Sequence, residues 1–210
     1  MSAGDVADDL REELSARQVD LVRVTYRLIA TRGIRRLSLQ EIADAAGVSK
    51  ALLLYHFGRK EALVLATMRW VLVSAERHIR RAIDGARTPD EAIDAMVDAI
   101  FTSAEENLRF YRTQLDLLDH ALDQRDDHFE RLSLSYRTIV NALYEEVVSR
   151  GVRAGSFQAR DVAEAATVLR AIVDGLFLQW LQEARPADAH SRYRDVCKRA
   201  IMAYLRDPGG

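Results

Sequence analysis

The sequence predicts an all-α protein of about nine helices, with an N-terminal helix-turn-helix domain of three short helices before a larger helical domain. Three observations support this fold class. Apolar residues recur at intervals of three and four along almost the whole chain, which is the period of an amphipathic helix. No segment alternates apolar and polar residues over the length of a strand. Only three prolines and ten glycines interrupt the 210 residues, and most of them fall where a helix is expected to end.

The lengths of these expected helices divide the chain into three parts. Residues 1–14 carry five acids and one arginine without an apolar stripe, so we expect a flexible acidic arm. Residues 15–58 contain the short helices and form the expected helix-turn-helix domain, and residues 59–210 contain six longer helices. The boundary near Gly58 has no flexible linker, so we expect it to lie inside a compact protein.

The three short helices have recognisable ends. The first is predicted to end at Gly33, because glycine is favoured just after a helix C-terminus. Ser38 and Glu41 match a capping box at the start of the second helix. Gly47 ends that helix, and the third begins a few residues later with the apolar run 52–54.

The longer helices follow from their apolar stripes. A helix from Arg59 to about Asp84 is apolar on nearly all sides over its first half, so it must be covered on more than one face. Thr88 and Pro89 are a typical N-cap and first residue of the next helix, whose stripe continues to Ala104. Four more helices are predicted over about 108–123, 132–147, 162–180 and 193–204, with breaks at Gly151, Gly155 and Pro186.

Composition excludes several classes of protein. No uncharged run exceeds eight residues, whereas a membrane-spanning helix needs about 20 apolar residues. The acidic N-terminus lacks the apolar core of a signal peptide. The single cysteine, Cys197, excludes an internal disulfide and a cysteine-based zinc site. Since common catalytic motifs such as HExxH, GxSxG and GxxxxGK[ST] are also missing, we expect a cytoplasmic protein that is not an enzyme and has no metal, cofactor or membrane partner.

Charge is concentrated in one segment of this near-neutral chain. Residues 15–60 have a net charge of +6, whereas residues 1–14 and 61–210 each carry −4. A basic block favours binding to a polyanion such as DNA. A solvated basic face would have the same composition.

The two short helices on either side of Gly47 match a helix-turn-helix, in which the second helix enters the major groove and the first supports it. An ordinary hairpin of two helices would have the same spacing. If the motif binds DNA, the groove-facing side chains are those of Ser49, Lys50, Ala51, Leu52, Tyr55 and His56.

The stretch 38–63 resembles the TetR family of bacterial transcriptional regulators. The similarity lies in a Ser cap, Ile-Ala, Ala-Gly-Val-Ser, Tyr-His-Phe and Lys-Glu-x-Leu, in that order. The nine-helix layout and the chain length extend the resemblance over essentially the whole sequence. It implies a ligand-responsive repressor that a small organic, mostly hydrophobic effector releases from a palindromic double-stranded DNA operator.

The resemblance also implies roles for individual residues of the DNA-binding domain. Lys50 and Ala51 match positions that approach base edges, whereas Ser38, Tyr55, His56 and Lys60 match phosphate contacts. At positions 52 and 54 the family often has Thr and Tyr, but this chain has leucine at both. We expect Leu52 to contact a thymine methyl group and Leu54 to lose one phosphate contact.

The larger domain is expected to bind the effector and to form a homodimer. The candidate effector contacts are Met68, Leu72, Met96, Phe101, Tyr111, Leu115, Asp116, His120, Tyr136 and Phe177. Ordinary packing accounts for each of them, although three of the aromatic residues beside an acid would suit a quaternary ammonium ligand. The last two helices are the expected dimer interface, through Leu169, Leu176, Trp180, Ile201 and Tyr204. A helix–helix crossing there would explain the mid-helix Gly175.

Two other functions remain open at this stage. One is a helical small-molecule-binding protein without specific DNA binding, which the presence of Lys50, Tyr55, His56 and Lys60 disfavours. The other is an enzyme with an all-α fold, for which the sequence offers no catalytic constellation.

Overall fold

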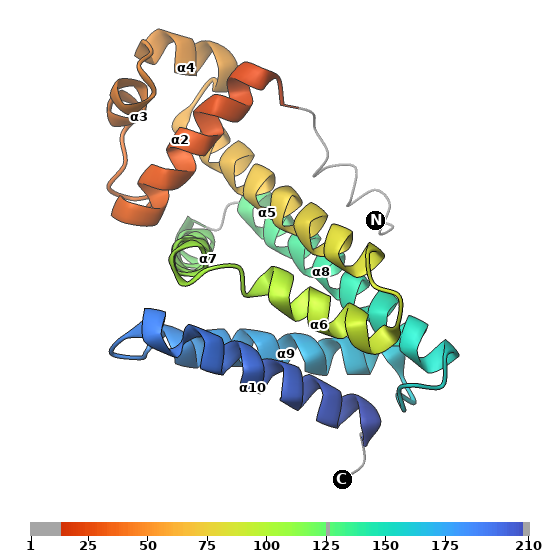
Figure 1. Ribbon diagram of the computed structural model, residues 1–210. Helices are drawn as coiled ribbons and strands as arrows, with labels where there is room; N and C mark the ends of the chain where they lie inside the picture. The colour runs from red at the N-terminus through yellow and green to blue at the C-terminus, as the bar shows by residue number, and fades with distance from the viewer. Residues whose placement is uncertain (1–13, 125–126, 208–210) are drawn as a thin grey trace. The chain divides into compact units, whose positions relative to one another are not determined.

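The computed structural model describes residues 14–124 and 127–207, and these ranges contain nine α-helices and no strand, which confirms the all-α class (Figure 1). Apart from Leu14, the acidic segment 1–14 lies outside the described residues. In chain order the helices are α2 (Ala16–Arg32), α3 (Leu39–Ala46), α4 (Lys50–Phe57), α5 (Lys60–Asp84), α6 (Pro89–Ile100), α7 (Ala104–Gln124), α8 (Asp127–Arg153), α9 (Val162–Leu181) and α10 (Pro186–Arg206).

The chain forms two compact units. The first consists of Met1–Ser74 and Arg109–Tyr136, and the second of Ala75–Leu108 and Arg137–Gly210. Helices α5, α7 and α8 therefore contribute residues to both units. The first unit contains the expected DNA-binding domain, and the boundary near Gly58 stays a prediction.

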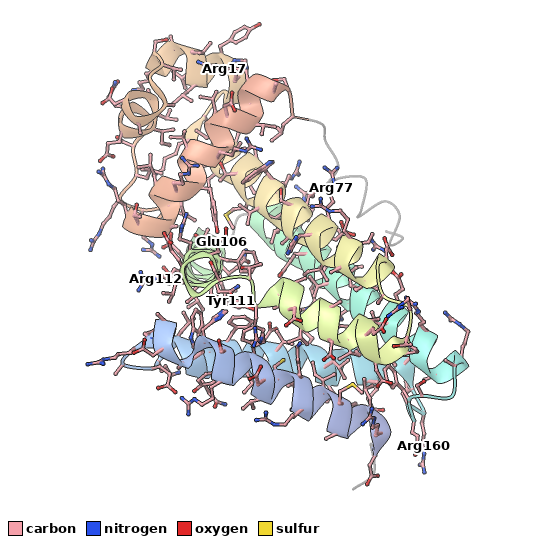
Figure 2. The ribbon with its side chains drawn as sticks, viewed as in Figure 1. Arg17, Arg77, Glu106, Tyr111, Arg112 and Arg160 are labelled. Carbon is pink, nitrogen blue, oxygen red and sulfur yellow. The ribbon has the colours of Figure 1, made fainter. Side chains whose placement is uncertain are left out.

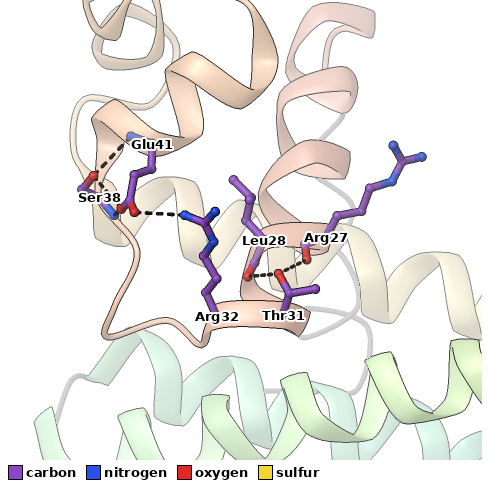
Figure 3. A network of polar contacts seen from close by, with 6 residues as sticks. All are labelled: Arg27, Leu28, Thr31, Arg32, Ser38 and Glu41. Carbon is purple, nitrogen blue, oxygen red and sulfur yellow. Dashed lines mark hydrogen bonds and ion pairs between the residues drawn. The ribbon is translucent and has the colours of Figure 1, made fainter.

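Local capping fixes the start of α3 in the first unit. Ser38 Oγ accepts a hydrogen bond from the Glu41 N–H (3.2 Å), and Glu41 accepts bonds from the Ser38 N–H and hydroxyl (2.8 Å each) (Figure 3). These bonds from Ser38, together with Arg32 at 3.1 Å, hold the pKa of Glu41 below its usual value. The predicted capping box is confirmed, and Gly47 ends α3 in the left-handed conformation (φ 64°).

Helices α2 to α5 enclose the apolar core of the first unit. Four apolar residues stand where the sequence of the helix-turn-helix requires its helices to pack together. Of these, Ala43 and Leu53 are fully buried, and Val48 and Phe57 are half-buried. The other buried residues of this core include Leu21, Val22, Ile29, Ile34, Leu37, Ile42, Leu63, Val64 and Met68.

In the second unit, α10 runs antiparallel to α9 and also packs on α6 (Figure 1). Opposite charges line the contact between α6 and α10. Lys198 on α10 lies 2.9 Å from Asp98 and 3.7 Å from Asp94, and Arg206 lies 3.1 Å from Asp90. Beneath them Cys197 is fully buried, and burial raises the pKa of its thiol to about 12.

Three predicted helix boundaries were wrong. Helix α6 ends at Ile100, before Ala104, because the Ser103 hydroxyl accepts a hydrogen bond from the Glu106 N–H and helps to start α7 there. Helix α8 continues through Gly151, which the sequence predicts as a break. Pro186 is the first residue of α10, whereas α9 already ends at Leu181. Proline suits a first helical position because the N–H that it lacks has no partner inside the helix.

Candidate nucleic-acid interface and effector region

Helix α4 exposes one face and buries the other. The Ser49 hydroxyl accepts a hydrogen bond from the Leu52 N–H (3.2 Å) and caps the helix. Leu53 is fully buried against the core of the first unit. Successive residues of an α-helix are about 100° apart, so the residues exposed to solvent share one face. They are Lys50, Ala51, Leu54 and Tyr55, and Ser49 at the N-cap just before the helix is also exposed.

This face agrees only in part with the predicted groove-facing set. Lys50, Ala51 and Tyr55 lie together on it, and Tyr55 is 83% exposed, whereas Ser49 is exposed at the N-cap before the helix. Leu52 and His56 are half-buried on the other side of the helix. Leu54, which was not predicted to face the groove, is exposed. The sequence does contain a signal for Leu54. It lies four residues after Lys50 and three after Ala51, and residues at these spacings share one side of a helix.

Cationic side chains accompany α4 at the ends of neighbouring helices. Gln18 Nε2 donates a hydrogen bond to the His56 carbonyl (3.4 Å), which ties the first turn of α2 to the end of α4. Arg17 is exposed in that same turn, which contains no acid (Figure 2). Lys60 is the first residue of α5 and is half-buried. Sequence reasoning missed Arg17, although a basic residue in a first helical turn is unusual enough to be a signal.

Ser38 has a structural role as well as its predicted phosphate contact. It is exposed at the N-cap of α3, and its hydroxyl takes part in the capping box. A short exposed helix that two others support, on a segment with a charge of +6, is the arrangement of a helix-turn-helix DNA-binding protein.

Helix α7 is bonded to the connection between α2 and α3. The Ile34 N–H donates a hydrogen bond to the Asp116 carboxylate, and Arg35 pairs with Asp119 at 3.0 Å. Gly33 faces the same carboxylate, since a Cβ at Gly33 would lie 3.5 Å from it. Asp116, predicted as an effector contact, thus has a backbone partner within the first unit.

The other predicted effector contacts are divided between the two units. In the first unit Met68 and Leu72 are buried and Tyr111 and Tyr136 are half-buried (Tyr111 in Figure 2), whereas Leu115 is 46% exposed. The side chain of His120 lies outside the described residues. Met96, Phe101 and Phe177 are buried in the second unit.

The structure brings Phe101 and Phe177 together in an aromatic cluster of the second unit. Their rings stack with centroids 4.2 Å apart, and Trp180 packs edge-on against Phe177. His190 lies against both Trp180 and Phe101. Asn107 donates from Nδ2 to the Ile100 carbonyl, so its Oδ1 accepts a bond from His190 Nε2 (2.8 Å).

Burial, with a smaller contribution from Arg194, lowers the pKa of His190. Sequence reasoning missed both His190 and Asn107, because no local pattern marks two residues that meet from distant helices. One polar group on α7 also lacks a partner. Among the residues that the structure describes, Gln114 Nε2 is buried without a hydrogen bond, which makes it a candidate polar contact for an effector.

The predicted dimer residues differ in their accessibility. Leu169, Trp180 and Ile201 have no exposed surface within the single chain, so intramolecular packing explains them and they are not available to a second copy. Leu176 and Tyr204 are half-buried. On the outer side of α9, Leu178 is 51% exposed, and a Cβ added at Gly175 would have no neighbour within 4 Å.

Neither a metal site nor a membrane span is found in the described ranges. They contain no group of three His, Cys, Asp or Glu side chains arranged to hold a metal ion. None of their helices combines the length and apolarity that crossing a bilayer requires.

Comparison with known proteins identifies the family. A family model described as bacterial regulatory proteins, tetR family, matches residues 21–67, and one described as BetI-type transcriptional repressor, C-terminal, matches residues 89–206. The transcriptional regulator BetI of Brucella canis is 34% identical over 180 residues, which cover 83% of this chain and 85% of that protein. BetI of Rhizobium meliloti is 30% identical over 92% of this chain and 91% of its own length.

A solved structure shares the same fold. A transcriptional regulator from Saccharomonospora viridis in complex with choline superposes with a TM-score of 0.77 at 20% identity, over 91% of this chain and 96% of the other. The chain belongs to the TetR family of bacterial transcriptional regulators, with a C-terminal region of the BetI repressor type. Its relatives are named as regulators and not as enzymes.

Proposed function

We propose that the chain acts as a homodimeric repressor whose two α4 helices read the half-sites of a palindromic operator. The observation that carries this proposal is the exposed face of α4, where Lys50 and Tyr55 project from a basic segment. Ser38, Arg17 and Lys60 would contact phosphates around it. That surface also disfavours a helical protein that binds only small molecules.

The need for two subunits follows from the size of the reading surface. Lys50 is the one charged side chain on the exposed face of α4, and a good bidentate base contact contributes about 1–3 kcal/mol of discrimination. One subunit therefore reads few positions. A dimer doubles the contacts and places them about one turn of DNA apart, or a multiple of it.

Release by a small organic effector is proposed to involve α7. This helix contains residues of both units, and Asp116 and Asp119 connect its second half to the loop between α2 and α3. An effector that shifts α7 would therefore disturb the position of the helix-turn-helix. We expect a coupling free energy between effector and DNA of about 1–3 kcal/mol.

For the effector we propose a mostly hydrophobic molecule, with a quaternary ammonium compound as the second candidate. Aromatic side chains support the second candidate, because Tyr111 and Tyr136, both half-buried in the first unit, have rings of the kind that bind such cations. The ring of Phe177 in the second unit is fully buried and stacked on Phe101. The choline complex of the Saccharomonospora viridis protein points to the same chemistry.

Selection of bound sequences from random duplex DNA tests the DNA-binding part. We expect a palindromic motif whose affinity falls steeply with salt. Lys50→Ala should reduce discrimination between this motif and random DNA, whereas Lys198→Ala, which removes the same charge from α10, should leave it intact. If no motif is enriched with the ligand-free protein, the proposed operator binding is wrong.

The effector class can be tested with two molecules of nearly equal shape. Choline and its uncharged carbon analogue 3,3-dimethylbutan-1-ol are compared for thermal stabilisation of the protein and for release of the selected DNA. Stabilisation and release by choline alone would support a cation site. Equal effects of both compounds would support a hydrophobic site, and no effect of choline would exclude the quaternary ammonium candidate.

A further inference from the structure

The centre of the exposed face of α4 is apolar. With about 100° between successive residues, Ala51 and Leu54 fall in the middle of this face, and Lys50 and Tyr55 lie at its two edges. Leu54 is 39% exposed, although a leucine side chain gains free energy from being covered. Leu53 on the opposite side is fully buried, so the apolar core does not need Leu54.

Neither central side chain can form a hydrogen bond. The Ser49 hydroxyl at the N-cap, just before this face, accepts the bond that caps α4. Base edges in the major groove present hydrogen-bonding groups and a single apolar group, the C5-methyl of thymine. An exposed leucine and alanine at the centre of a groove-facing helix therefore match that methyl group and no other feature of the bases.

We infer that Leu54, supported by Ala51, determines operator specificity by contacting thymine methyl groups. The inference rests on the proposed operator binding and reassigns to Leu54 the role that the sequence predicts for Leu52. Residues three apart on a helix have Cβ atoms about 5–6 Å apart, and base pairs follow each other every 3.4 Å along each strand. Both side chains can therefore contact bases of the same half-site that are one or two base-pair steps apart.

The test replaces thymine by deoxyuridine, which removes only the methyl group. In the selected operator, each thymine is replaced in turn at symmetric positions of both half-sites, and the affinity of the full-length protein is measured. A covered methyl group contributes about 0.8 kcal/mol, or about fourfold in affinity. We expect about a 15-fold loss of affinity at one thymine position of the motif, because the free-energy losses at the two distant half-sites add. Replacement at the other thymines should change the affinity little.

The Leu54→Ala variant links that loss to the side chain. It should bind thymine and deoxyuridine operators with affinities within about twofold of each other at the sensitive position. Leu118→Ala, which shortens a leucine on α7 that is more exposed than Leu54 (50% against 39%), should keep the 15-fold difference. Thermal unfolding of both variants checks that they fold.

The outcomes separate the two proposals. A motif whose deoxyuridine forms all bind as well as the thymine form would overturn methyl recognition but not operator binding. A deoxyuridine effect that persists in Leu54→Ala would assign the contact to another side chain and overturn the role of Leu54. If no sequence is enriched at all, operator binding fails and methyl recognition fails with it.

Discussion

Lys60 and Lys50 differ in the kind of DNA contact that they can make. Lys60 begins α5 outside α4, whereas Lys50 lies on the exposed face. A lysine that neutralises one phosphate contributes about 0.9 to the slope of log affinity against log salt, whatever the sequence. Lys60→Ala should therefore lower this slope by about 1 and weaken operator and random DNA alike. Titrations of operator and random DNA from 50 to 300 mM salt measure this slope. An unchanged slope would show that Lys60 does not contact a phosphate.

His190 is a single residue that should make stability depend on pH. Burial lowers its pKa below the ordinary 6.5, so below pH 6.5 the unfolded chain takes up a proton before the folded one does. The contribution of neutral His190 to the free energy of unfolding is fully present above this pH. It is lost as the pH falls, by up to about 1.4 kcal/mol per pH unit for one proton. Urea unfolding between pH 7.5 and 5 measures the loss.

The matched variants are His190→Gln and His78→Gln. The first can still donate to Asn107 but does not titrate, so its stability should fall less steeply with decreasing pH than that of the wild type. His78 is exposed on α5, and its replacement should leave the steep dependence in place. Equal slopes for all three proteins would assign the acid sensitivity to other titratable groups and not to His190.

Among the helices, α8 depends on a glycine that its own sequence does not explain. A Cβ at Gly151 would lie 1.9 Å from Cδ2 of Phe157, whose buried ring packs against the helix. Overpacking of this kind costs about 1–3 kcal/mol. Gly151→Ala should lower the free energy of unfolding by that amount in denaturant titrations. Gly85→Ala, whose Cβ would have ordinary contacts at 3.6 Å, should change it by less than about 1 kcal/mol.

The helix ends that the sequence predicts correctly are those whose signals are local. Ser38 and Glu41 cap α3 through contacts within one turn, and Thr88 accepts the Glu91 N–H at 3.1 Å to start α6. Gly151 was predicted as a break because glycine disfavours a helix interior. The helix continues there because the ring of Phe157 fills the space of the missing side chain. Only tertiary packing distinguishes such a glycine from a helix end.

Over the whole molecule, sequence periodicity locates apolar faces but does not tell what covers them. The inward residues of the helix-turn-helix were predictable because its three helices are short and adjacent in sequence. The dimer residues were not, since Trp180 and Ile201 sit on apolar stripes that the chain itself covers. Trp180 also donates from its indole nitrogen to the Pro186 carbonyl (2.6 Å), so replacing it would unfold the second unit instead of separating subunits.

The proposed dimer contact therefore shifts to the outer side of α9, where Gly175 and Leu178 are three residues apart. A glycine inside a helix costs about 1 kcal/mol relative to alanine, and no contact with the residues that the structure describes accounts for Gly175. A crossing helix of a second copy would account for it and would also cover Leu178. Leu178→Glu places a charge in that contact, so sedimentation should show monomers at concentrations where the wild type is dimeric.

Binding to the two-half-site operator should weaken in parallel, while binding to random DNA changes little. Gly175→Ala separates the two explanations for the glycine. If no helix of a second copy crosses at Gly175, this variant should gain up to about 1 kcal/mol of stability and dimerise as the wild type does. If α9 is crossed closely, it should dissociate more readily than the wild type. A fully dimeric Leu178→Glu variant would place the interface elsewhere, and the long exposed face of α9 would then have no assigned partner.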